Sequence, residues 1–149
     1  MNLDVDLDKD LLDLQFLDGL AFFRLNKYNE AIKIFDKVIE LDTNDSKAYY
    51  FKGLALYLLN KYPQAIECLN KTLALDPNNL EAYSFKGNAL IDSNQYSEAI
   101  DCFDKIIELN PNECSAFYDK EFCLEMIKNS KNRKNSFKAI FSCFAKKLC

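Results

Sequence analysis

The chain contains no histidine, and it has only three glycines and three prolines in 149 residues. Histidine is the side chain that most often serves as a general base, so its absence removes the commonest nucleophile-and-base pairs. The cysteines form no CxxC pair, and no phosphate-binding loop of the GxxxxGKS/T or GxGxxG type occurs. We therefore expect no catalytic residue, no metal site and no cofactor, and the chain is predicted not to be an enzyme.

The sequence also lacks the marks of export and membrane insertion. Residues 1–14 are acidic, without the basic start of a signal peptide, and no apolar run approaches the roughly 18 residues that cross a bilayer. These absences favour a cytoplasmic protein. Disulfide frameworks belong to small secreted chains, so most of the six cysteines are expected to be small buried apolar side chains, with Cys149 a free thiol.

Basic side chains are in the minority, with 19 Lys and Arg against 23 Asp and Glu and a net charge of −4. Phosphate backbones are bound through clustered Lys and Arg, so neither nucleic acid nor a membrane is an expected partner of the whole domain. The charge is unevenly distributed. The first 13 residues hold five Asp and one Lys, whereas residues 128–149 hold seven Lys or Arg and no acid.

What the sequence does have is one regular period, of about 34 residues. Its three glycines, Gly19, Gly53 and Gly87, are equally spaced, each one period from the next. The same spacing relates three tyrosines, three alanines and three leucines: Tyr28, Tyr62 and Tyr96; Ala31, Ala65 and Ala99; Leu41, Leu75 and Leu109. A period of this length is typical of a solenoid, in which each unit buries its apolar face only by stacking on a neighbour.

Each unit is predicted to be a pair of antiparallel helices, because apolar residues recur at helical spacing in both of its halves. Asn26, Asn60 and Asn94 separate the halves, and asparagine tolerates the left-handed conformation that ends a helix. The predicted single all-α domain divides into an acidic lead-in that turns helical near Asp8 (1–11), three repeats (12–45, 46–79 and 80–113) and a divergent fourth repeat or cap (114–149).

These residues resemble the tetratricopeptide repeat family. Its order of large, small, large, small and large residues before a turn proline is matched by Tyr83, Gly87, Leu90, Ala99, Phe103 and Pro111. The second repeat matches equally well. The resemblance implies a right-handed α-solenoid of antiparallel helix pairs with three clear repeats. Gln15 and Thr43 depart from the pattern in the first repeat, and Glu121 and Arg133 replace the glycine and the alanine in the fourth.

The small residues of the period are assigned to packing. Glycine inside a helix costs about 1 kcal/mol relative to alanine, so a compensating contact is expected at Gly19, Gly53 and Gly87. Close approach of two helix backbones is the predicted contact. The facing helix of each pair carries Ala31, Ala65 and Ala99.

The resemblance also implies a concave groove, lined by the first helix of each repeat, in which members of the family bind peptides or partner helices. The predicted groove residues are Phe16, Leu20, Phe23, Tyr50, Leu54, Tyr57, Phe85 and Asn88. Such an apolar set is typical of a face that accepts an apolar peptide or the apolar side of an amphipathic helix. Members that bind a chaperone's terminal carboxylate carry Lys, Asn and Arg on this face, where this chain has Phe51, Glu81 and Phe85, so that ligand is not expected.

The sequence leaves alternatives open. Phe51 and Phe85 share one repeat position, which is equally typical of packing between repeats. The preferred prediction is a non-catalytic scaffold for an unknown protein or peptide. A homo-oligomer that uses the groove and the oppositely charged ends is the alternative. A weaker one is contact of residues 128–149 with anionic lipid or RNA.

Overall fold

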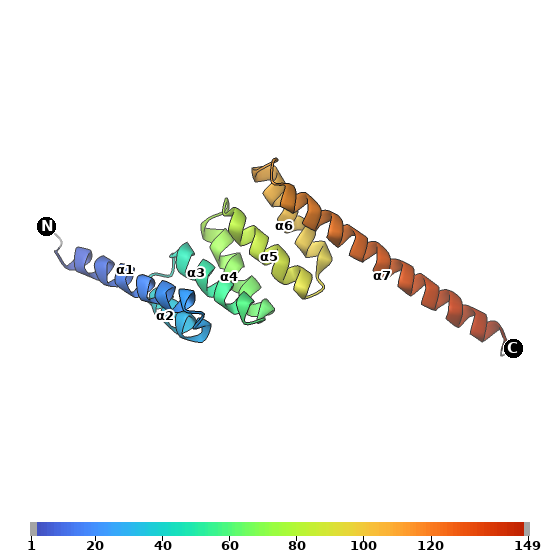
Figure 1. Cartoon of the computed structure of the whole chain (residues 1–149), viewed down its shortest axis with the longest axis horizontal. Helices are drawn as coiled ribbons and strands as arrows, with labels where there is room; N and C mark the ends of the chain where they lie inside the picture. Colours follow the sequence, from blue (N-terminus) through green and yellow to red (C-terminus); the bar gives the residue numbers. More distant parts are fainter. Residues whose placement is uncertain (1–2, 148–149) are drawn as a thin grey trace.

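The computed structural model describes the backbone of residues 3–147 and the side chains of residues 9–133, and this part of the chain forms seven helices and no strand. The helices are α1 (Leu3–Arg24), α2 (Tyr28–Leu41), α3 (Ser46–Leu58), α4 (Tyr62–Leu75), α5 (Leu80–Asp92), α6 (Tyr96–Leu109) and α7 (Cys114–Lys147). The pairs α1–α2, α3–α4 and α5–α6 follow one another along an elongated molecule, and α7 extends away from the last pair (Figure 1). The predicted all-α solenoid of antiparallel helix pairs is confirmed.

The turn inside each pair depends on an asparagine in the left-handed conformation. Asn26, Asn60 and Asn94 have φ angles of 58°, 57° and 59°, as their recurrence predicted. The Oδ1 atom of each accepts a hydrogen bond from the hydroxyl of the tyrosine two residues later, at 2.7, 2.9 and 2.8 Å. The asparagine therefore ends the first helix, and its side chain holds the first residue of the second.

We expect Asn60→Ala to lower the free energy of unfolding by about 1 kcal/mol, because alanine disfavours the left-handed region and has no side-chain acceptor. Asn60→Gly should leave stability within about 0.5 kcal/mol of the parent protein, since glycine enters that region freely. Urea unfolding followed by circular dichroism measures both changes. Equal effects of alanine and glycine would contradict the assignment, and Tyr62→Phe isolates the contribution of the hydrogen bond.

The turns between pairs begin the next helix with a side-chain cap. Asp45 Oδ1 accepts hydrogen bonds from the backbone N–H groups of Lys47 and Ala48 at 2.9 and 3.0 Å. Asn79 Oδ1 accepts one from the N–H of Ala82 at 2.9 Å. Such caps satisfy N–H groups that have no partner within the helix. The start of α3 and the start of α5 are thereby fixed at equivalent positions of the period.

The core lies between the helices of each pair. Phe35, Leu69 and Phe103 share one repeat position and are fully buried. A Cβ atom added at Gly87 would lie 2.7 Å from Cζ of Phe103, and one at Gly19 would lie 2.6 Å from Cε1 of Phe35. The close approach predicted at the glycines therefore involves a large side chain of the second helix rather than its backbone. One turn earlier on those helices, Ala31, Ala65 and Ala99 are fully buried.

Both ends of the molecule differ from the sequence-based expectation. Helix α1 already begins at Leu3, within the stretch expected to be a lead-in, because no glycine or proline interrupts residues 1–18. The segment 114–149, predicted as a divergent repeat or cap, is one helix from Cys114 to Lys147 with no turn in the polar stretch 128–135. That segment likewise lacks glycine and proline. Apolar residues at helical spacing in the last part of the segment, from Phe137 to Phe144, predict one apolar helix face, and their side chains lie outside the described part of the chain.

The described cysteines are all free thiols. Cys68, Cys102 and Cys123 are buried, whereas Cys114 is exposed. Burial raises the pKa of Cys102 to about 11, so this thiol stays protonated at neutral pH and packs as an apolar side chain. The prediction for Cys149 falls outside the described residues.

Candidate functional site

Aromatic rings from the first helices of the three pairs form a connected surface that we call the aromatic row. Its members are Phe16 and Phe23 on α1, Tyr50, Phe51 and Tyr57 on α3, and Phe85 on α5. The helix α3 contacts both α1 and α5. The row therefore crosses three units and is assembled only when they stack.

The same ring arrangement occurs twice in the row. Phe51 lies against both Phe16 and Phe23, with ring centroids 5.8 Å apart in each case. One unit later, Phe85 lies 6.3 Å from Tyr50 and 5.8 Å from Tyr57. A spacing of seven residues places two rings on one face of a helix two turns apart, so the ring of the next unit enters between them. The period of the sequence thus sets the geometry of the row.

The predicted groove residues are all part of this surface or next to it. Five of the eight, Phe16, Phe23, Tyr50, Tyr57 and Phe85, are members of the row. The other three, Leu20, Leu54 and Asn88, share a single repeat position. It lies between the two rings on α1 and on α3, and between Ser84 and Ile91 on α5. All eight are half-buried. The five ring members pack against rings of neighbouring units and also keep accessible surface. The use of all eight side chains as ligand contacts stays a prediction.

Phe51 is the residue that the predicted set omits. Its ring contacts those of Phe16, Phe23, Phe35 and Tyr50, the last with centroids 5.2 Å apart. Phe51 thus links the row to the core between α1 and α2. The sequence did indicate Phe51, because it lies one period before Phe85, which is in the predicted groove set.

Acidic side chains lie beside the row on α5. Burial raises the pKa of Tyr50, and the negative charge of Glu81 adds to the effect. The pKa of Tyr57 is raised by burial and further by Asp92. Both Glu81 and Asp92 are exposed at the surface. A segment bound along the row would therefore meet negative charge near its α5 end.

The row stops before α7. The residue of α7 in the repeat position of Phe51 and Phe85 is Asp119, and the ring pair that would receive it is replaced by Ser84 and Ile91. Burial raises the pKa of the Asp119 carboxyl. The contact between the third unit and α7 therefore lacks a ring packed between two others, and Tyr96 of α6 instead meets Phe122 of α7 with ring centroids 6.5 Å apart.

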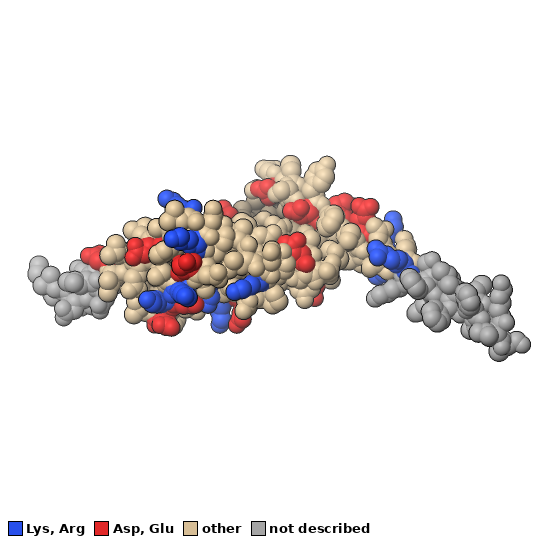
Figure 2. Space-filling model, turned by 60° about the horizontal axis from the view of Figure 1, so that its bottom comes forward, with Lys and Arg blue, Asp and Glu red and all other residues tan. Residues whose placement is uncertain are grey.

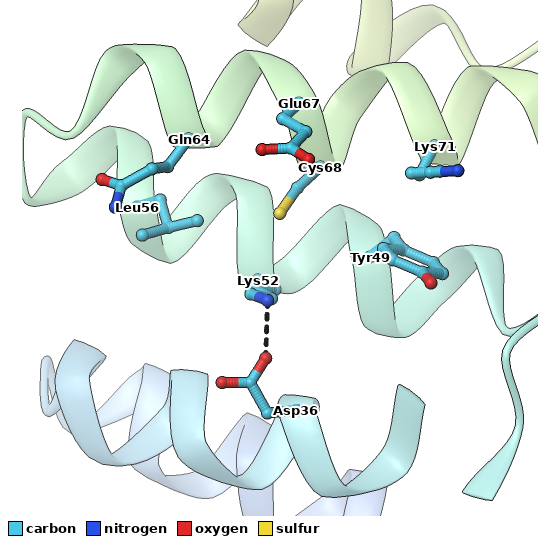
Figure 3. A pocket seen from close by; sticks show the side chains of 8 residues that line it. All are labelled: Asp36, Tyr49, Lys52, Leu56, Gln64, Glu67, Cys68 and Lys71. Atoms are coloured by element: carbon cyan, nitrogen blue, oxygen red, sulfur yellow. Dashed lines mark ion pairs between the residues drawn. The ribbon is translucent and has the colours of Figure 1, made fainter. Parts of the chain in front are cut away.

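A different face of α3 lines a hollow of about 440 Å³ together with α2 and α4 (Figure 3). Lys52 Nζ lies 2.5 Å from Asp36 Oδ1 there, and the buried thiol of Cys68 lies beside them, its pKa raised by burial. The lining mixes two lysines with two acids, so it favours no ligand of one charge. The ion pair instead joins the first unit to the second.

The described residues give no sign of two other kinds of site. Their side chains include no group of three or more Cys, Asp or Glu placed to hold a metal ion. Over the same range, no helix combines the length and the hydropathy needed to pass through a bilayer.

Comparison with protein families matches residues 24–106 to the model described as anaphase-promoting complex, cyclosome, subunit 3. The first TPR domain of Spaghetti (RPAP3), bound to the HSP90 peptide SRMEEVD, has a similar structure with a TM-score of 0.71 at 24% identity, over 78% of this chain and 95% of that one. The Arabidopsis OM64 TPR domain gives 0.72 at 22% identity, over 78% and 96%. The protein MamA gives 0.76 at 24% identity, over 91% and 73%. The comparison with curated proteins found no match.

Proposed function

We propose that this chain, a member of the anaphase-promoting complex, cyclosome, subunit 3 family, is a non-catalytic scaffold. It is built of tetratricopeptide repeats and binds an amphipathic helix of a partner protein along the aromatic row. The observation that carries the proposal is the continuity of the row. Six half-buried rings from three units form one surface, and their contacts with one another hold them in place without a ligand.

The chemistry of the row defines the chemistry of its ligand. A connected aromatic surface complements an apolar stripe whose side chains recur three, four and seven residues apart on a helix. Glu81 and Asp92 flank the α5 end of the row and favour Lys or Arg beside that stripe. The rigid scaffold loses little conformational freedom on binding, so most of the ordering cost falls on the ligand.

The acidic peptides bound by similar domains do not match this surface. The Spaghetti (RPAP3) domain was solved with SRMEEVD, and the second human RPAP3 TPR domain with the HSP70 peptide SGPTIEEVD. Both peptides end in acidic residues and a carboxylate, which need basic partners. The aromatic row offers rings, and Glu81 lies beside it. We therefore propose a ligand of the opposite charge.

A peptide selection tests the proposal. Peptides selected for binding from a displayed library of helical sequences should carry an apolar stripe and a net positive charge, and SRMEEVD should show no saturable binding below about 1 mM. The double variant Tyr50→Ala/Tyr57→Ala should weaken binding of the selected peptides at least about tenfold, because aromatic anchors dominate such interfaces. Fluorescence anisotropy measures each affinity.

The matched control is Tyr49→Ala, which removes a half-buried tyrosine from the same helix but from the face that lines the hollow. It should leave peptide affinity unchanged. Equal losses from Tyr49→Ala and the row variant would assign binding to another surface. Selection of acidic peptides, or tight binding of SRMEEVD, would overturn the proposed ligand.

A further inference from the structure

Helix α1 is apolar on two opposite sides. One side packs on α2 and α3 through the rings of Phe16 and Phe23. The other side carries Leu11, Leu14 and Leu17, which are 52%, 58% and 59% exposed. A helix that is apolar all round is normally buried on every side. The second side of α1 therefore has the composition of a contact surface.

We call this surface, made by Leu11, Leu14, Leu17 and Ala21, the outer face of α1. All four residues are exposed, and successive members are three or four residues apart, so they lie on one side of the helix. The helix forms one end of the array of pairs (Figure 1). Terminal units of a soluble solenoid usually present a polar outer face. The apolar face of α1 therefore requires a partner.

The outer face does not match the joints inside the array. There, the first helix of a unit packs mainly on the second helix of the preceding unit. Lys52 meets Asp36 across the first joint, and Lys120 meets Asp104 across the third, at 2.5 and 2.6 Å. The first unit has Asp18 at the position of these lysines. A preceding unit of the same kind would place an acid beside Asp18, so the face disfavours such a unit as its partner.

The charges beside the outer face favour a second copy of α1 that runs in the opposite direction. Asp10 and Asp13 lie along its N-terminal half and Arg24 lies at its C-terminal end, and all three are exposed. Figure 2 shows acidic side chains next to the undescribed N-terminal residues. Asp10 and Arg24 are about four turns apart, so both lie along one edge of the helix, with Leu17 midway between them. An antiparallel pair centred on Leu17 places acid opposite base twice, whereas a parallel pair places acid opposite acid.

We propose that two copies of this chain form an antiparallel dimer through the outer face of α1, with Leu14 of each copy against Ala21 of the other and Asp10 opposite Arg24. A large side chain then meets a small one on both sides of the two-fold axis, as close packing requires. Both copies use the same surface, so the association closes at a dimer. The aromatic row lies on the other side of α1 and stays accessible, so the dimer is independent of peptide binding.

Sedimentation velocity of the parent protein and its variants tests the dimer. One helix from each copy makes a small interface, so we expect a dissociation constant of about 10 to 100 µM. The mass should rise with concentration from 17.3 kDa toward twice that value and no further. Leu14→Asp and Leu17→Asp each bury a charge in the contact and should weaken association at least about tenfold. Both positions are exposed, so the circular dichroism spectrum should not change. Leu75→Asp, at an exposed position of α4, is the matched control and should associate like the parent protein.

Charge reversal tests the direction of the two helices. Arg24→Asp should weaken association about tenfold at low salt and less at high salt, because Asp10 of each copy then faces an acid. The double variant Asp10→Arg/Arg24→Asp exchanges the two charges and should restore the parent affinity. The Asp18 carboxylates of the two copies approach each other near the two-fold axis, so Asp18→Asn should strengthen association.

Each of the other outcomes contradicts the proposal. A mass that stays at 17.3 kDa at concentrations up to about 500 µM would exclude the dimer. Growth beyond twice that mass would exclude a closed two-fold pair. Parent-like association of Leu14→Asp or Leu17→Asp, or an equal loss in Leu75→Asp, would place the contact elsewhere. An exchanged variant no better than Arg24→Asp, or weaker association of Asp18→Asn, would exclude the antiparallel arrangement.

Discussion

Replacing Gly87 by leucine should lower the free energy of unfolding by about 3 kcal/mol, the upper end of the range for overpacked cores. A Cβ atom alone would lie 2.7 Å from Cζ and 2.9 Å from Cε1 of Phe103. That ring is fully buried and closely packed, so it has no free space into which to move. Urea unfolding followed by circular dichroism measures the loss.

A second glycine supplies the matched control. At Gly53 the nearest atom to an added Cβ is Cγ of Leu69 at 3.1 Å, so the contact is milder than at Gly87. Alanine stabilises a helix by about 1 kcal/mol relative to glycine, which offsets much of the steric cost of that contact. Gly53→Ala should therefore stay within about 1 kcal/mol of the parent protein. Gly87→Ala, whose Cβ would lie 2.7 Å from Cζ of Phe103, should lose more stability than Gly53→Ala. Adding Phe103→Leu to Gly87→Ala should restore part of that loss, and no restoration would contradict the steric cause.

The architecture was readable because its signals are local and repeated. Three glycines at one spacing predicted the units, and Asn26, Asn60 and Asn94 predicted turns whose φ angles are positive. The hydrogen bonds from the tyrosines to these asparagines were not predicted, although both series had the same period. Spacing places a residue on the chain but does not give the direction of its side chain.

The ends of the molecule were less predictable for a related reason. Residues 1–18 and 112–149 contain no glycine or proline, so their sequence carries no strong signal that would end a helix. The pattern of the last unit was predicted to decay, yet its polar stretch 128–135 continues as helix. A polar composition alone therefore does not identify a turn.

The candidate site shows the same limit at the level of single residues. Five of the predicted groove residues are members of the aromatic row, because their positions follow from the period. From the sequence alone, packing between repeats and contact with a ligand were alternative roles for these positions. In the structure, Phe85 packs between Tyr50 and Tyr57 and remains half-buried, so packing does not exclude an accessible surface. Phe51 lies on the same predicted face but was left out of the predicted set, and the repeat position that it shares with Phe85 is equally typical of packing between repeats.

Truncating Phe51 to alanine should lower the free energy of unfolding by about 3 kcal/mol, the lower end of the range for phenylalanine in cores. Its ring contacts four others from three helices, including the fully buried Phe35. Tyr50→Ala removes contacts with only two rings, Phe51 and Phe85, and should lower stability by about 1 kcal/mol. Urea unfolding of the two variants gives the comparison.

The position of the loss along the solenoid distinguishes this role of Phe51 from a general effect on folding. In a solenoid each unit contacts only its neighbours, so a weakened joint frees the unit at the end first. Amide hydrogen exchange in Phe51→Ala should therefore accelerate in α1 and α2 and stay near the parent rates in α5 and α6. A uniform acceleration, or a loss of stability no larger than that of Tyr50→Ala, would contradict the assignment. If it holds, Phe51 maintains the row while Tyr50 and Tyr57 remain available for a ligand, and the two roles separate by experiment on a single helix.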